Sequence, residues 1–179
     1  IEVSALNGNN IENLKEMNAS FINDFKESFS HVLDSGWYIL GKNVTAFEEE
    51  FAQFVGVKHC IGLASGLNAL ELSLSCYDFP VGSEVIVPSN TYIATILAIV
   101  NAGLKPVLVE PDLSTYNIDP DLIDKAVTSK TVAVMVVHLY GKSCDMDPIL
   151  TVCKKNNLKL VEDCAQSHGA KYKGKMTGS

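Results

Sequence analysis

The stretch Thr131-Val132-Ala133-Val134-Met135-Val136-Val137-His138 is apolar at every position from Val132 to Val137. A run of this kind, rich in β-branched residues, is typical of a strand buried within a parallel sheet. A helical pattern follows at Asp147–Asn156, and a second short apolar run follows at Lys159–Glu162. The stretch therefore predicts a strand of a parallel sheet whose next strand is reached through a helix.

The same alternation extends toward the N-terminus. We expect three further strands, at His59–Leu63, Glu84–Val87 and Pro106–Val109, and three further helices, at Leu67–Cys76, Thr91–Ala102 and Asp119–Val127. Short apolar strands that alternate with helices predict βαβ units with right-handed crossovers. The sequence therefore favours an α/β fold of three αβα layers around a mainly parallel sheet.

Two amphipathic helices precede this pattern. Apolar residues at helical spacing predict the first helix from Phe21 to Leu33, and a second from Val44 to Phe54. Residues 1–20 are polar and rich in asparagine, so we expect an N-terminal arm there and a domain over residues 21–179.

The composition excludes several classes of partner. With a net charge of −7 and a pI of about 5.0, the 179-residue chain has no basic surface for a nucleic-acid backbone. No apolar run has the length of a membrane span, and the first residues lack the basic start of a secretion signal. The five cysteines form no CxxC pair, so we expect reduced thiols, no metal site and a cytoplasmic location.

Polar residues follow the predicted strands, where ligands bind in sheets of this type. Ser65-Gly66-Leu67-Asn68 lies between a strand and a helix, so the positive helix end there favours an anion. The alternative is that Ser65 only caps the helix and Gly66 only fits a tight turn. Because neither a GxGxxG nor a P-loop motif occurs, a single phosphate suits this turn better than a dinucleotide.

Asp163 follows the last strand, where a partly dehydrated carboxylate needs a partner. A protonated pyridine nitrogen is one such partner, and a lysine or the cap of a turn is the alternative. Tyr92, at the mouth of another strand, offers a flat ring that can stack on a flat cofactor, although ordinary packing is also open. His168 is expected to be a hydrogen-bonded structural residue.

Taken in order, these motifs resemble the DegT-type sugar aminotransferases, a family of fold type I that uses pyridoxal 5'-phosphate. The resemblance runs from about Phe25 to Ser179. Six segments carry it: Ser35–Gly41, Ala64–Leu70, Gly82–Pro88, Asn90–Thr95, His138–Gly141 and Glu162–Gly169.

The resemblance implies roles for individual residues. It makes residues 21–179 the cofactor-binding large domain and implies that Ser65, with the N–H groups of Gly66 and Leu67, binds the cofactor phosphate. Many family members have threonine where this chain has Leu67, so a hydroxyl contact is absent here. The resemblance also implies three contacts to the cofactor ring, through Tyr92, Asp163 and Gln166. For the substrate it implies contacts from Trp37, Tyr38 and Asn90.

The implied reaction moves an amino group from glutamate to a nucleotide-linked keto-deoxysugar, with dTDP-3-keto-6-deoxyhexose favoured, in a homodimeric enzyme. Lys171, Lys173 and Lys175 do not match the family's Schiff-base lysine and are expected on a solvated hairpin. We expect that lysine to lie beyond Ser179, which would make the sequence a fragment. The alternatives are a dehydratase of the same family, with histidine in place of lysine, and a non-catalytic module that binds the cofactor or a nucleotide sugar.

Overall fold

The computed structural model describes residues 14–179. Residues 1–13 of the predicted arm lie outside the described residues, while the rest of it forms α1 (Leu14–Met17) and enters the 3-10 turn η1 (Ala19–Phe21). The chain divides into two compact units at the boundary between Phe47 and Glu48.

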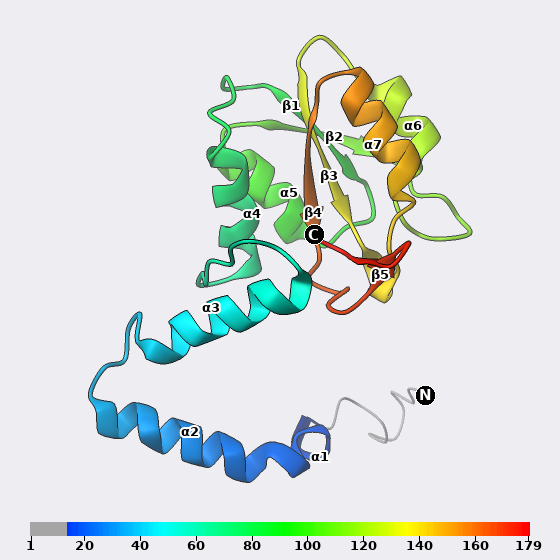
Figure 1. Ribbon diagram of the computed structural model, residues 1–179. Coiled ribbons are helices and arrows are strands. Elements are labelled where there is room, and N and C mark those ends of the chain that lie inside the picture. The colour runs from blue at the N-terminus through cyan, green and yellow to red at the C-terminus, as the bar shows by residue number, and fades with distance from the viewer. Residues whose placement is uncertain (1–13) are drawn as a thin grey trace, which may run out of the picture. The chain divides into compact units, whose positions relative to one another are not determined.

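The second unit contains a four-stranded parallel sheet with the strand order β2-β1-β3-β4 (Figure 1). Its strands are β1 (Glu84–Pro88), β2 (Lys105–Val109), β3 (Thr131–Val137) and β4 (Lys159–Asp163). The neighbouring strands pair in parallel, as β1–β2, β1–β3 and β3–β4. The predicted parallel sheet is thus confirmed for these four strands.

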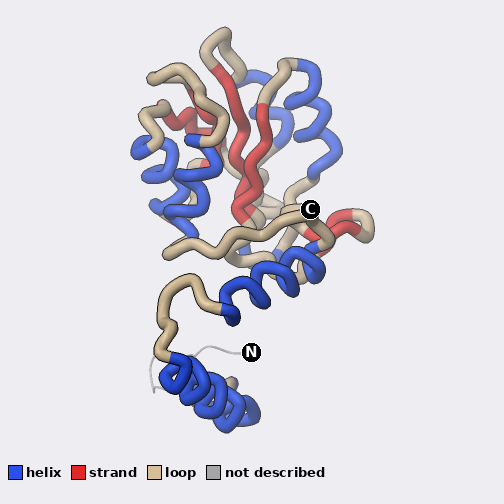
Figure 2. The backbone as a smooth tube through the Cα atoms, turned by 60° about the vertical axis from the view of Figure 1, so that its left-hand side comes forward, coloured by secondary structure: helices blue, strands red, loops and turns tan. Residues whose placement is uncertain are grey.

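Helices cover both faces of this sheet, as Figure 2 shows. One face carries α4 (Gly66–Ser75) and α5 (Ile93–Asn101), and the other carries α6 (Pro120–Ala126) and α7 (Met146–Lys155). Side chains alternate along each strand, so Val85 and Val87 join one hydrophobic core while Ile86 joins the other. This two-core arrangement is the predicted three-layer αβα fold.

The segment His59–Leu63 is not a strand, which corrects our prediction. A strand needs a neighbour for its backbone hydrogen bonds, and the sheet order of the described chain gives this segment none. Its apolar side chains stay accessible instead, with Ile61 74% exposed. The N–H of Gly62 in this segment donates to Glu48 Oε1 at 2.7 Å.

The end of the chain folds into a small hairpin of β5 (Lys171–Tyr172) and β6 (Lys175–Met176). The Tyr172 hydroxyl donates to Asp145 at 2.7 Å, which ties the hairpin to the start of α7. The lysines at positions 171, 173 and 175 are exposed, as expected for a solvated hairpin.

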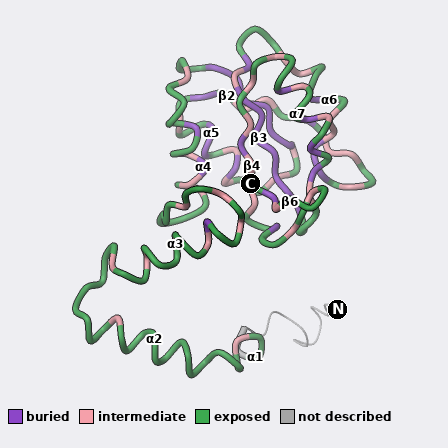
Figure 3. Tube along the Cα trace, viewed as in Figure 1, coloured by how far each residue is buried: buried purple, intermediate pink, exposed green. Residues whose placement is uncertain are grey.

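In the first unit, the described residues form helices joined by short non-helical segments. The predicted first helix is α2 (Ile22–Ser35), and it ends as expected at Gly36, whose φ of 65° is left-handed. No residue of α2 is buried, and Figure 3 shows nearly all of the helix exposed. The predicted second helix is α3 (Lys42–Val55), which crosses the boundary between the units. Among the described residues, no helix combines the length and the apolar character that a membrane span requires.

Candidate functional site

Because β1, β3 and β4 are parallel, their carboxyl ends meet at one edge of the sheet. The residues that follow these strands therefore share this edge although they are distant in the sequence. Hydrogen bonds connect them directly, from Thr95 to Asp163 and from Tyr140 to Gln166. We call this region the strand-end edge.

Asp163 is the last residue of β4 and is partly buried. Its Oδ2 accepts the hydroxyl of Thr95 at 3.1 Å, and its Oδ1 accepts the N–H of Ala165 at 3.1 Å. Within residues 14–179, no lysine forms an ion pair with Asp163. The hydrogen bond from Ala165 is a local turn contact. Asp163 therefore also caps the turn that follows β4, which was one of the alternatives for this residue.

Helix α4 begins at Gly66, and Ser65 is its N-cap. The Ser65 hydroxyl accepts the N–H of Asn68 at 3.2 Å, as the capping alternative expects. Gly66, however, needs no special backbone conformation, and a Cβ placed there would have nothing within 4 Å. Open space at the positive end of a helix is compatible with an anion that approaches the backbone closely. Helix α4 packs against α5, the helix that carries Thr95, and against β4, the strand that ends at Asp163.

Tyr140 and Gln166 are connected across the strand-end edge. Gln166 Oε1 accepts the N–H of Tyr140 at 2.8 Å, and Tyr140 has a left-handed φ of 56°. Left-handed tyrosines are uncommon and cluster at functional sites. With its oxygen occupied, Gln166 keeps its amide N–H₂ as the donor for a ligand.

The aromatic and amide residues expected to face ligands are accessible. Tyr92 is 73% exposed and comes directly before α5, three residues from Thr95. Asn90 Nδ2 donates to the carbonyl of Tyr116 at 2.9 Å, so part of its amide is used to hold a neighbouring loop.

Trp37 and Tyr38 belong to the first unit and are 68% and 65% exposed. Their polar atoms bond within their own segment: Trp37 Nε1 donates to the carbonyl of Ile39 at 2.6 Å, and the Tyr38 hydroxyl donates to that of Leu33 at 3.1 Å. Both rings remain exposed, and their contact with the substrate stays a prediction.

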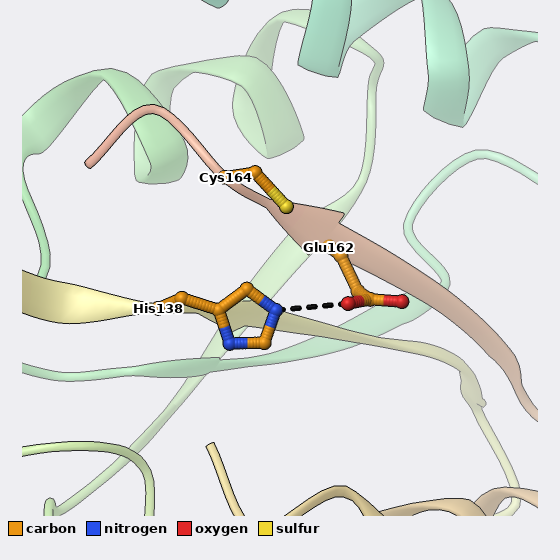
Figure 4. A group of neighbouring side chains, drawn as sticks. All are labelled: His138, Glu162 and Cys164. Carbon is orange, nitrogen blue, oxygen red and sulfur yellow. Dashed lines mark hydrogen bonds and ion pairs between the residues drawn. The ribbon is translucent and has the colours of Figure 1, made fainter. Parts of the chain in front are cut away.

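The other face of the strand ends carries a polar cluster that sequence spacing did not reveal. His138 follows β3, and its Nε2 lies 2.9 Å from Glu162 Oε2, with Cys164 beside them (Figure 4). Glu162 also accepts the N–H of Gly178 at 3.0 Å. Burial raises the pKa of Glu162, but these donors hold the pKa below its ordinary value, so the side chain is a carboxylate.

His138, Glu162 and Cys164 are metal-ligand types whose candidate atoms lie within 4.8 Å of one another. The imidazole, however, is committed to hydrogen bonds. The N–H of Cys144 donates to Nδ1 at 3.0 Å, so the neutral ring carries its proton on Nε2 and donates it to Glu162. A metal on Nε2 would move that proton to Nδ1, against the Cys144 N–H. We therefore assign this cluster to holding the ends of β3 and β4 and the C-terminal segment together.

A cavity of about 220 Å³ lies next to this cluster, and its lining includes Phe51, Phe54, Glu162 and Cys164. It contains none of the predicted cofactor residues. His168 also lines it and packs edge-on against Phe51, with ring centroids 5.9 Å apart, which agrees with a structural role.

Comparison with known proteins places these features in a family. The model of the DegT/DnrJ/EryC1/StrS aminotransferase family matches residues 20–179. A dTDP-3-amino-3,6-dideoxy-alpha-D-galactopyranose transaminase from Aneurinibacillus thermoaerophilus is 57% identical over 166 residues, which are 93% of this chain and 46% of that protein. The chain thus spans about half the length of such relatives.

Two solved structures are similar to this one. S. venezuelae DesV, in complex with a ketimine intermediate, has a TM-score of 0.90 and 42% identity, covering 93% of this chain and 45% of its own. The E. coli GDP-4-keto-6-deoxy-D-mannose-3-dehydratase, with bound hydrated PLP, has a TM-score of 0.81 and 30% identity, covering 86% and 41%. From the ordered motifs, the fold and these matches, the chain belongs to the DegT/DnrJ/EryC1/StrS aminotransferase family.

Proposed function

We propose that the protein carrying this chain is a pyridoxal-phosphate-dependent aminotransferase that transfers the amino group of glutamate to a nucleotide-linked keto-deoxysugar. The observation that carries the proposal is the Asp163 carboxylate, which accepts a hydrogen bond on each oxygen at the strand-end edge and forms no ion pair with a lysine of the described chain. A family match over residues 20–179 and a transaminase at 57% identity support the class of reaction.

The residues at the strand-end edge fit pyridoxal phosphate. When bound, this cofactor supplies a cationic ring that accepts electrons from the substrate carbon next to the nitrogen. In our proposal the Asp163 carboxylate pairs with the ring nitrogen and keeps its proton in place. The exposed ring of Tyr92 covers one face of the cofactor, and the amide of Gln166 donates to the ring hydroxyl.

The phosphate group has a separate anchor in this proposal. The open position at Gly66 lets the phosphate approach the N–H groups of Gly66 and Leu67, at the positive end of α4. The Ser65 hydroxyl adds a side-chain contact. This arrangement compensates for the overall charge of −7, which would otherwise repel an anionic ligand.

For the substrate we propose a dTDP-linked 3-keto-6-deoxyhexose, since the relative at 57% identity is named for a dTDP-linked 3-amino sugar. Trp37, Tyr38 and Asn90 are the proposed substrate contacts. We also propose a homodimer, which the exposed aromatic segment around Trp37 favours, and a cytoplasmic location, because the five cysteines are free.

A spectroscopic assay tests the proposal. The full-length protein is incubated with pyridoxal phosphate and then glutamate, and conversion to the pyridoxamine form is followed by absorbance. We expect conversion in the wild type and a rate lower on the order of 100-fold in Asp163→Asn, which removes one preorganised charge. Absence of conversion in the wild type, or an unchanged rate in the variant, would contradict the proposal.

A sugar dehydratase is the second candidate, because the GDP-4-keto-6-deoxy-D-mannose-3-dehydratase shares this fold at 30% identity. The two reactions give different products from the same sugar substrate. An aminotransferase adds nitrogen to the sugar, while a dehydratase removes a hydroxyl group and adds no nitrogen. Mass spectrometry of the product, with ¹⁵N-labelled glutamate, separates them.

A further inference from the structure

A pair of threonine hydroxyls reaches the Asp163 carboxylate from another element of the fold. Thr91 Oγ1 and Thr95 Oγ1 lie 2.8 Å apart, from residues four positions apart in the sequence, and Thr95 Oγ1 lies 3.1 Å from Asp163 Oδ2. Thr95 is only 1% exposed, whereas Thr91 is partly buried. The contact joins residues that are 68 positions apart.

The direction of both hydrogen bonds follows from the atoms involved. A carboxylate only accepts, so the single hydroxyl proton of Thr95 points to Asp163. The Thr95 oxygen is then an acceptor, and Thr91 donates to it. The two hydroxyls form a one-way chain of donors that ends on Oδ2, in which each bond strengthens the next.

The Thr95 hydroxyl differs from the other hydroxyls inside helices of this unit. Such groups commonly bond to the carbonyl four residues earlier. Ser73, Ser75 and Thr151 all do so, at 2.7, 2.9 and 2.8 Å. Thr95 instead directs its proton out of its own helix, to a carboxylate on β4.

We propose that Thr95, supported by Thr91, is a positioning residue that fixes the Asp163 carboxylate for its contact with the cofactor ring nitrogen. The inference rests on the proposed function. Thr95 holds Oδ2 and the N–H of Ala165 holds Oδ1, so the carboxylate group is restrained from turning about its Cβ–Cγ bond. The remaining lone pairs of the Asp163 carboxylate therefore keep a fixed direction. A fixed direction favours a charge-assisted hydrogen bond to a ring N–H.

The test uses the full-length protein and two readouts besides activity. One is the Kd for pyridoxal phosphate. The other is the pH midpoint for deprotonation of the ring nitrogen of the bound cofactor, followed by absorbance. Thr95→Val keeps the shape of the side chain but lacks the hydroxyl. We expect about tenfold weaker cofactor binding and a lower pH midpoint, because the protonated ring loses a well-oriented partner. Thr95→Ser should stay within about twofold of wild type, since it keeps the hydroxyl.

Two further variants complete the design. Thr91→Val removes only the hydroxyl that donates to Thr95, and it should weaken the binding of pyridoxal phosphate about twofold to threefold. This variant keeps the test valid if Thr95→Val does not fold. Thr151→Val on α7 is the control and should leave both readouts unchanged.

The outcomes separate the inference from the proposed function. Wild-type affinity and midpoint in a folded Thr95→Val, or equal losses in Thr95→Val and Thr95→Ser, would overturn the positioning role alone. If Thr95→Val does not fold, wild-type values in Thr91→Val overturn it. A wild-type protein that binds no pyridoxal phosphate would overturn both.

Discussion

Helices α2 and α4 are both amphipathic, yet α4 buries Leu70 and Leu74 while α2 buries no residue. Helix α4 has a sheet face beside it, and its leucines join Val85, Met135 and Val161 in one core. Helix α2, in the N-terminal unit, leaves Phe25 and Phe29 51% and 64% exposed. An apolar stripe thus predicts a helix in both places. The stripe adds to the free energy of unfolding only where it packs against other residues. We expect the free energy of unfolding of this chain to come mainly from the α/β unit.

The largest expected effect tests this difference directly. Leu74 is 1% exposed, so Leu74→Ala leaves a cavity in the core and should lower the free energy of unfolding by about 3 kcal/mol. Phe29→Ala, in the N-terminal unit, should change it by less than about 0.5 kcal/mol in the monomer. Urea denaturation measures both. Equal losses in the two variants would show that α2 is packed as firmly as α4.

A smaller effect concerns the polar contacts of the α/β unit. Glu162→Gln should cost about 2 kcal/mol at pH 7, because it removes the charge that accepts from His138 and Gly178. The folded-state pKa of Glu162 lies below the ordinary 4.5, so its stabilisation is present above that pH and is lost as the pH falls through the folded pKa.

The difference between Glu162→Gln and wild type should therefore shrink below about pH 4.5. Urea denaturation across pH 3–7 measures it, and Glu50→Gln on the exposed surface of α3 serves as the control. A constant difference over this range would argue against an ionised Glu162 in the folded protein.

Gly66→Ala separates binding from folding within the α/β unit. A Cβ at this position contacts nothing in the protein, so the free energy of unfolding should stay within about 0.5 kcal/mol of wild type. The affinity for pyridoxal phosphate, measured by absorbance titration of the full-length protein, should fall about tenfold, because the methyl group occupies the space proposed for the phosphate. Unchanged affinity would place the phosphate elsewhere.

The smallest effect returns to the N-terminal unit. Gly36 ends α2 with a φ of 65°, and alanine in that conformation is strained by about 1 kcal/mol. Gly36→Ala should therefore reduce helix content measured by circular dichroism, with little change in the main unfolding transition. A shift of that transition as large as the one for Leu74→Ala would mean that the two units unfold together.

The sequence predicted the sheet well because each strand carries its own signal. The apolar run before His138 and the run before Asp163 became β3 and β4 within one residue of the expected ends. The segment His59–Leu63 has the same apolar character but is not a strand, because pairing depends on a neighbour that local sequence does not reveal.

The candidate site was predicted only in part. Asp163, Tyr92 and Gly66 follow strands or begin helices, so the pattern of the fold singles them out. Thr95 lies inside a helix, and nothing local distinguishes it from other helical threonines. Its role depends on a contact across 68 positions, and the His138–Glu162 pair likewise depends on which strands become neighbours.

A crystal structure of the full-length protein with pyridoxal phosphate tests the central claim most directly. We predict the pyridine nitrogen about 2.8 Å from an Asp163 carboxylate oxygen, with the phosphate at the first turn of α4. A ring nitrogen directed to another residue, or a phosphate bound away from Gly66, would contradict the account.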